Sequence, residues 1–284
     1  MEKDKNKRKG SFLFYMIPVV LIVAIGVFGF LFLRDFMAYR EADSEYAILQ
    51  EYMTEAQDQA SAQESSVSAE TPEASAPEST EYVKPPYQYL SIDYDKLKSI
   101  NDDFVGVIDI PALSIKYPVV YSVDNANYLH RTFENRNNFA GSIFLDANAA
   151  RDFNDANTFI FGHNMKNGSM FGKLKHFATK SGLVDSDPYI YIYLKDEVRK
   201  YRIFSFYQTV DGSEVYNDFD GDQGYEQYVK MILRNSSYKT FDQSAVDFTQ
   251  HPKLITLSTC TGRTDGNQRF VVHAALVESI AYTS

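Results

Sequence analysis

The fold is decided by Leu254-Ile255-Thr256-Leu257-Ser258-Thr259-Cys260 and by the stretch that begins Arg269-Phe270-Val271-Val272-His273. Both stretches are rich in β-branched residues and are separated by a polar loop, which predicts two neighbouring strands. Because side chains alternate along a strand, Ile255, Leu257 and Thr259 share one face, and Cys260 ends the strand on the other, more polar face.

Further runs of the same kind occur throughout residues 82–284, which are numerous enough for one domain with a substantial core. The strands expected besides these two are Phe104–Ile110, Ile115–Tyr121, Ser142–Leu145, Thr158–Phe161, Tyr189–Leu194 and Val198–Val210, and the last strand extends over Arg269–Val277. Helices are expected at Tyr94–Ile100, Ala126–His130, Met170–Phe177 and Gln223–Arg234. The pattern predicts a mostly β fold, an eight-stranded barrel decorated with helices.

An uncharged run from Ser11 to Leu33 precedes this domain. Its 23 residues would span about 34 Å as a helix, enough to cross a bilayer core. A cleaved signal peptide is the alternative, but the run is long and no small-residue cleavage site follows it. Lys3, Lys5 and the other basic residues before the run favour a cytoplasmic N-terminus, by the positive-inside rule, and an extracytoplasmic domain.

The segment 41–81 carries eleven acidic and no basic side chains, and it accounts for most of the net charge of −10. From Ala60 to Thr80 its composition is that of a disordered spacer, while Asp35 to about Gln59 could continue the membrane helix outward. We therefore expect a cytoplasmic tail (1–10), an anchor (11–33), a juxtamembrane helix and spacer (34–81) and a tethered domain (82–284). Without a basic stripe, nucleic acid binding is not indicated.

Cys260 is the sole cysteine of the chain. An unpaired thiol is unusual outside the cell, and a thiol needs a cationic neighbour or a base to become a good nucleophile. Arg269 and a histidine could supply these groups, although a buried structural cysteine is the plainer alternative. The one cysteine and five histidines have no zinc-motif spacing, so no metal site is expected. Attack of a thiolate on a carbonyl needs no cofactor, and none is expected.

Three stretches carry a family resemblance: Phe159-Ile160-Phe161-Gly162-His163-Asn164-Met165, Thr256-Leu257-Ser258-Thr259-Cys260 and Arg269-Phe270-Val271-Val272-His273. They resemble the signature stretches of sortases, the membrane-anchored cysteine transpeptidases of Gram-positive bacteria, and the Leu-Ser-Thr-Cys variant resembles class B in particular. The resemblance implies that Cys260 is the nucleophile, His163 the acid/base and Arg269 the stabiliser of the carbonyl oxygen. Ser258, Asn125 and Leu129 are the implied substrate contacts.

The same resemblance implies partners and an activity. Surface proteins with a C-terminal sorting signal would be cleaved and transferred to an amine of the cell wall, through a thioester on the cysteine. A pilin lysine as acceptor, a hydrolysing cysteine peptidase and a catalytically inactive surface binding protein on the same fold are the alternatives. His273 competes with His163 for the acid/base role. His130, His176 and His251 are expected to be solvated or capping, and Arg263 and Asp265 could also touch the site.

Overall fold

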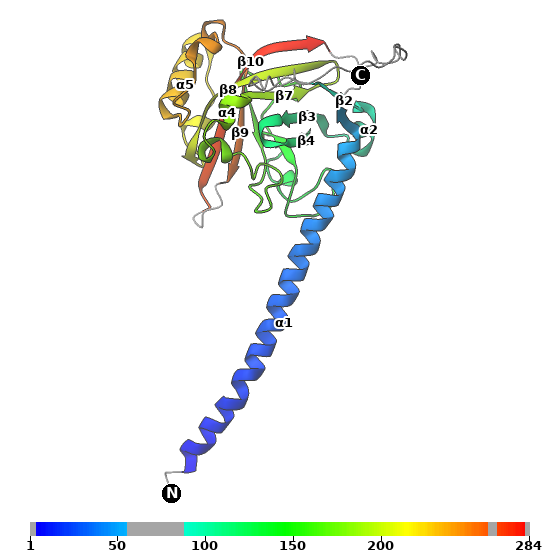
Figure 1. The fold of residues 1–284 in the computed structure, drawn as a ribbon, viewed down its shortest axis with the longest axis vertical. Helices are drawn as coiled ribbons and strands as arrows, with labels where there is room; N and C mark the ends of the chain where they lie inside the picture. Colours follow the sequence, from blue (N-terminus) through cyan, green and yellow to red (C-terminus); the bar gives the residue numbers. More distant parts are fainter. Residues whose placement is uncertain (1–3, 56–87, 261–265, 282–284) are drawn as a thin grey trace, which may run out of the picture.

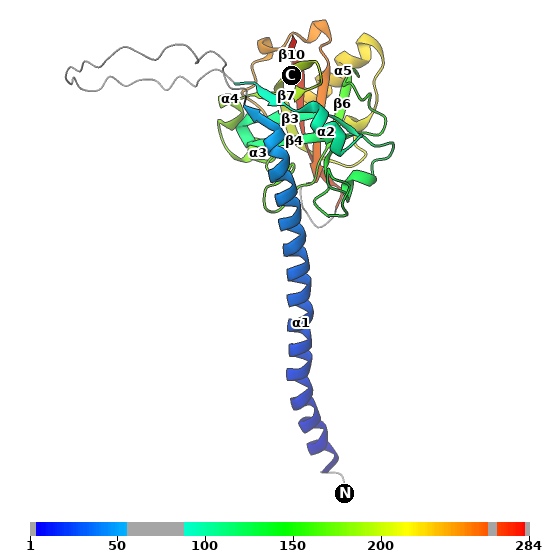
Figure 2. The same cartoon turned by 90° about the vertical axis from the view of Figure 1, so that its right-hand side faces the viewer.

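A computed structural model of the chain describes residues 4–55, 88–260 and 266–281. Its most extended feature is α1 (Asp4–Leu49), a single helix that projects from a β domain in both views (Figure 1, Figure 2). The portion from Met16 to Tyr52 is long and apolar enough, by length and composition, to cross a membrane. The expected continuation of the apolar helix beyond Asp35 is confirmed as far as Leu49, where a 3-10 turn, η1 (Gln50–Tyr52), replaces it.

The domain is built on a closed barrel of eight strands, with the order β10-β8-β7-β3-β4-β5-β6-β9. The predicted fold class and all eight expected strands are confirmed. Their bounds are β3 (Phe104–Ile110), β4 (Ile115–Val120), β5 (Ile143–Leu145), β6 (Asn157–Phe161), β7 (Tyr189–Tyr193), β8 (Glu197–Val210), β9 (Leu254–Cys260) and β10 (Gln268–Ala281). Most neighbours are antiparallel, but β6 pairs with β9, and β4 with β5, in parallel.

Two of the four expected helices are confirmed: α2 (Tyr94–Ile100), capped by the Asp93 carboxylate, and α5 (Gly221–Asn235). The Ala126–His130 segment forms only the 3-10 turn η4 (Asn127–Leu129). The prediction of a helix over Met170–Phe177 was wrong. Met170 has φ +51°, a left-handed conformation that an α-helix does not contain, and it forms a β-bridge with Asn164. Helix α3 (His176–Thr179) therefore begins only later.

The structure also contains several short elements that the sequence did not predict. These are the strands β1 (Met53–Glu55) and β2 (Leu90–Ile92), helix α4 (Leu183–Ser186), and the 3-10 turns η3 (Pro111–Leu113), η5 (Glu214–Tyr216), η6 (Gln243–Ala245) and η7 (Phe248–Gln250). Strands β1 and β2 form a separate antiparallel pair in which Glu55 lies opposite Leu90. The predicted spacer at Ala60–Thr80 lies outside the described residues.

The core has two parts, one inside the barrel and one between its outer face and α5. Ile255 and Leu257 of β9 face the interior, whereas Leu254 packs outside against a cluster that includes Tyr228 and Ile232 of α5. The predicted alternation of β9 is therefore confirmed. This arrangement leaves the far end of β9, where Cys260 lies, as a half-buried edge of the barrel.

The last turns of α1 pack against the barrel directly. Ala42, Tyr46 and Leu49 are buried in the same core cluster as the barrel interior, and so is Met53 of β1. Hydrogen bonds reinforce the packing: Gln50 donates to the Lys116 carbonyl, and the Lys116 ammonium donates to the Met53 carbonyl. The folded unit therefore includes residues 42–53, which lie in the first part of the acidic segment 41–81.

Candidate active site

Strand pairing places Cys260 beside Arg269. The last residue of β9 and the second residue of β10 are directly opposite each other in the antiparallel register. Opposed residues in an antiparallel pair have neighbouring side chains, with Cβ atoms about 4.5–5.5 Å apart. The thiol is half-buried and unpaired, so the adjacency predicted from the two sequence stretches is confirmed.

The parallel pairing of β6 with β9 brings His163 to the same end of the barrel. Phe161 is aligned with Ser258, and the Gly162 amide donates to the Ser258 carbonyl. His163 and Cys260 each lie two residues beyond this aligned pair. Gly162 allows the close approach expected of it, because a Cβ there would lie 2.4 Å from Ile143 Cδ1 and 2.8 Å from Phe171 Cδ2.

The imidazole of His163 is oriented by the backbone. Its Nε2 lies 2.7 Å from the Leu129 carbonyl oxygen, which requires a proton on Nε2 and leaves Nδ1 as the basic nitrogen of the neutral ring. Burial lowers the pKa of His163, the bond to Leu129 raises it, and the stacked ring of His130 lowers it. His130 is exposed, as expected, but its contact with His163 was not foreseen.

Arg269 is held by acceptors on two sides. One terminal nitrogen donates to the Gly266 carbonyl at 2.7 Å, and the other donates to Asp211 Oδ2 at 3.0 Å. Only 19% of the Arg269 side chain is exposed. Asp211 follows directly after β8, so its place beside Arg269 depends on the β8–β10 pairing and was not signalled in the sequence.

Ser258 is buried, and its hydroxyl shares a 2.8 Å hydrogen bond with the phenol of Tyr216 in η5. Burial raises the pKa of Tyr216, while the Ser258 bond and the charge of Arg269 lower it. The charge of a Cys260 thiolate raises the pKa of the same phenol. Tyr216 thus belongs to the surroundings of Cys260 and Arg269, although sequence reasoning did not single it out.

The other two expected substrate contacts lie around η4. Asn125 is exposed and is held by Asp146, to whose carboxylate it donates, and by the Ala147 amide, from which it accepts. Leu129 is half-buried and reaches His163 through its carbonyl. Leu129 is therefore at the site, while Asn125 marks the edge of the same loop region.

His273 is not at this site. It lies opposite Thr256, four residues along β10 from Arg269, and it is fully buried between the rings of Phe204 and Tyr207. Burial lowers its pKa to about 3, so the ring is neutral. His251 pairs with Asp222, and His176 begins α3. Arg263 and Asp265 lie outside the described residues.

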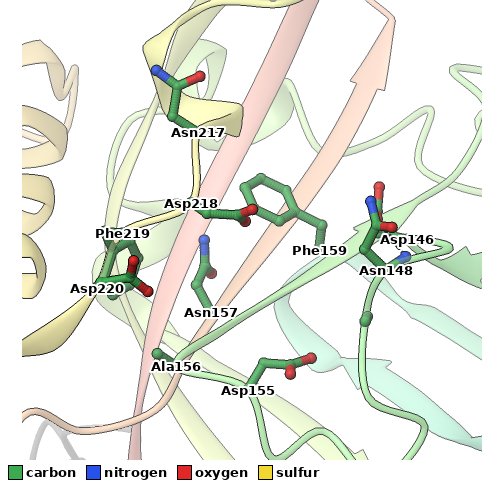
Figure 3. A pocket seen from close by; sticks show the side chains of 11 residues that line it. Asp146, Asn148, Asp155, Ala156, Asn157, Phe159, Asn217, Asp218, Phe219 and Asp220 are labelled. Atoms are coloured by element: carbon green, nitrogen blue, oxygen red, sulfur yellow. Dashed lines mark hydrogen bonds between the residues drawn. The ribbon is translucent and has the colours of Figure 1, made fainter.

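Two hollows adjoin these elements. A small one of about 40 Å³ lies at the thiol and is lined by Asn164, Phe171, Lys175, Gln208, Thr259, Cys260 and Phe270. A larger one of about 290 Å³ is lined by four aspartates and three asparagines, with Asp146 and Asp155 on one wall and Asp218 and Asp220 on another (Figure 3). Asp146 and Asp155 accept hydrogen bonds from the backbone. In the described part of the chain, no group of three or more His, Cys, Asp or Glu side chains is arranged to hold a metal ion.

Comparison with known proteins agrees with this geometry. The sortase domain family matches residues 108–277. Sortase B of Listeria monocytogenes is 35% identical over 185 residues, 64% of this chain and 72% of the relative, and sortase B of Staphylococcus aureus is 27% identical over 268 residues, 93% and 96% of the two chains.

Solved structures of sortase B have the same fold. That of Bacillus anthracis, in complex with AAEK1, aligns with TM-score 0.64 and 28% identity over 86% of this chain and 99% of that chain. That of Clostridium perfringens aligns with TM-score 0.58 and 32% identity over 65% and 99%. The chain therefore belongs to the sortase family of transpeptidases, and it resembles the class B members.

Proposed function

We propose that Cys260 is the nucleophile of the transpeptidase, His163 its acid/base and Arg269 its oxyanion stabiliser. The observation that supports this most directly is the strand register. Pairing of β9 with β10 puts Arg269 opposite Cys260, and pairing of β6 with β9 carries His163 to the same barrel end. A thiol, an imidazole and a guanidinium are the groups that acyl transfer through a thioester requires.

The chemistry follows from these groups. The Cys260 thiolate attacks a peptide carbonyl in the sorting signal, and imidazolium at His163 gives a proton to the departing amine as the C–N bond breaks. The product is a thioester. An incoming amine then attacks the thioester, loses its proton to His163 and releases the thiolate, so that one amide replaces another.

Burial favours the neutral form of His163 and so limits the imidazolium population at neutral pH. The bond from Nε2 to the Leu129 carbonyl opposes this effect, because a protonated ring donates more strongly. Arg269, fixed by Asp211 and the Gly266 carbonyl, would offer its guanidinium to the oxygen that gains charge during attack.

We further propose that α1 anchors the enzyme, with its N-terminus in the cytoplasm and the barrel outside. The apolar portion of α1 and the basic residues that precede it support this orientation. The partners are surface proteins with a C-terminal sorting signal and an amine of the cell-wall peptide. Ser258, Asn125 and Leu129 are the proposed substrate contacts, Leu129 with the strongest support because its carbonyl bonds His163.

Intact mass measurement tests the proposal. The chain would be incubated with a panel of sorting-signal peptides, with and without oligoglycine or a diaminopimelate peptide as the amine. We expect a thioester adduct that is lost in Cys260→Ala and a ligated product when the amine is present. Hydrolysed peptide without ligation would favour a peptidase, and the absence of any adduct with every peptide would favour a binding protein.

A further inference from the structure

The docked end of α1 contacts the loop that lies behind His163. Tyr46 is buried, and its hydroxyl donates to the Gly141 carbonyl at 2.9 Å and lies 3.2 Å from Ser142 Oγ. Its ring packs edge-on against Tyr117, with centroids 5.2 Å apart. A residue 95 positions away in sequence is thus fixed to this loop.

The Gly141–Ser142 turn in turn holds the backbone that orients His163. The Ser142 amide donates to the Tyr128 carbonyl at 2.9 Å. Gly141 has φ +61°, and a Cβ there would lie 2.8 Å from the Leu129 carbonyl oxygen and 3.1 Å from His163 Cδ2. The turn therefore packs directly against both partners of the Leu129–His163 hydrogen bond.

Contacts other than those of Tyr46 also hold this end of α1 against the barrel. Glu45 accepts from the Glu134 amide at 2.8 Å, the Asn138 side chain donates to the Ala38 carbonyl at 2.9 Å, and Leu49 has no exposed surface. The helix should therefore remain docked when one hydroxyl is removed, so the effect of that hydroxyl can be isolated.

We propose that Tyr46 is a positioning residue for His163, so that the helix bearing the proposed membrane anchor also completes the active-site scaffold. This inference rests on the proposed acid/base role of His163. Without the Tyr46 hydroxyl the turn loosens, and the Leu129 carbonyl no longer holds Nε2 at 2.7 Å. Since that bond favours the protonated ring, its weakening reduces the imidazolium that protonates the leaving amine.

Tyr46→Phe removes only the hydroxyl, and Tyr225→Phe is a matched control. Tyr225 is also a buried helical tyrosine whose hydroxyl donates to a single backbone carbonyl, that of Pro252 at 2.8 Å, but it lies in α5. Full-length wild type and both variants would be compared in detergent for kcat, KM, thermal unfolding and the pH profile of peptide transfer. His130 is the titratable group that acts on the His163 ring, and Cys260 and Arg269 lie at the same end of the barrel; all three are unaltered in these variants.

We expect Tyr46→Phe to lower kcat about 3- to 30-fold with little change in KM, because misplacement of a reacting group by a fraction of an ångström has effects of this order. The basic limb of the pH profile should move to lower pH, and the His163 ring, followed by NMR, should titrate at lower pH. Tyr225→Phe should lose a similar amount of stability and keep both the rate and the profile.

Ser142→Ala supplies a second variant, since it removes the other hydroxyl at the Tyr46 contact, and it should shift the His163 titration in the same direction. A Tyr46→Phe enzyme with the wild-type rate and profile, or with losses equal to those of the Tyr225 control, would overturn the positioning role. Absence of turnover in the wild type would instead refute the proposed function, while the NMR titration would still report whether Tyr46 acts on His163.

Discussion

Stability against acid should depend strongly on His273. The ring has no exposed surface, and its pKa is lowered to about 3. Thr256 donates to Asn157, so Nδ1–H of His273 donates to Thr256, and Nε2 has no hydrogen-bond partner among the described residues. Protonation would bury an unpaired charge and is therefore disfavoured in the folded state.

The size of the effect follows from linkage. An unfolded histidine titrates near pH 6.5, whereas the folded ring titrates near 3. The unfolded state therefore binds more protons below pH 6.5, so stability is fully present above that pH and is lost as the pH falls toward 3. Between pH 7.5 and pH 5 the loss amounts to about 2 kcal/mol, at about 1.4 kcal/mol per pH unit.

His273→Leu tests this reasoning, because Thr256 keeps its bond to Asn157 in the variant. The assay is urea unfolding at pH 7.5 and pH 5, using a soluble chain that begins at Asp35 and so keeps the docked turns of α1. Wild type should lose about 2 kcal/mol more than the variant between the two pH values, whatever the variant's stability at pH 7.5. Equal losses in both proteins would refute a buried neutral His273. The variant should also retain peptide transfer, since His273 lies away from Cys260.

The other predictions concern the active site and the acidic segment. Arg269→Lys should lower kcat/KM about 100-fold or more, because a point charge does not replace the fixed guanidinium, whereas Arg263→Lys should retain most activity; steady-state kinetics that show comparable losses would contradict the assignment of Arg269. Cys260→Ala should abolish turnover in the mass assay and change the free energy of unfolding by no more than about 1 kcal/mol, and global unfolding would instead indicate a core cysteine. Deleting 60–80 should leave turnover unchanged and alter the free energy of unfolding by about 1 kcal/mol at most, as urea unfolding would show, since the flanking strands β1 and β2 are paired; a large loss of stability would indicate that the segment packs on the barrel.

The barrel could be predicted because its information is local. Every strand is a β-branched or aromatic run bounded by turn residues, and alternation assigned the faces of β9 correctly. Strand β9 ends at Cys260, and His163 follows the end of β6 by two residues, so the parallel pairing of β6 with β9 carries both residues to one end of the barrel.

What the sequence left open depends on contacts between distant loops. Asp211 meets Arg269 because β8 pairs with β10, and Tyr216 meets Ser258 because the turn η5, which follows β8, lies against β9. Met170 adopts a left-handed conformation, which is uncommon for a residue other than glycine. None of these features has a periodicity that a single sequence could reveal.

The charge pattern indicated a domain on a long tether, but the contacts of α1 argue for a short connection. From Met16 onward, the first buried side chain of α1 is that of Ala42, nine residues after Leu33 ends the apolar run, and nine helical residues rise about 14 Å. The predicted spacer 60–80 lies in sequence between the paired strands β1 and β2, and so after the contacts that join α1 to the barrel. Helix α1 is thus joined directly to the barrel, and its Tyr46 is hydrogen-bonded to the turn behind His163. If α1 crosses the membrane as proposed, it holds the active site at a fixed height and orientation above the bilayer. The sorting signal must then reach that position, because the domain cannot move over a range of distances to meet it.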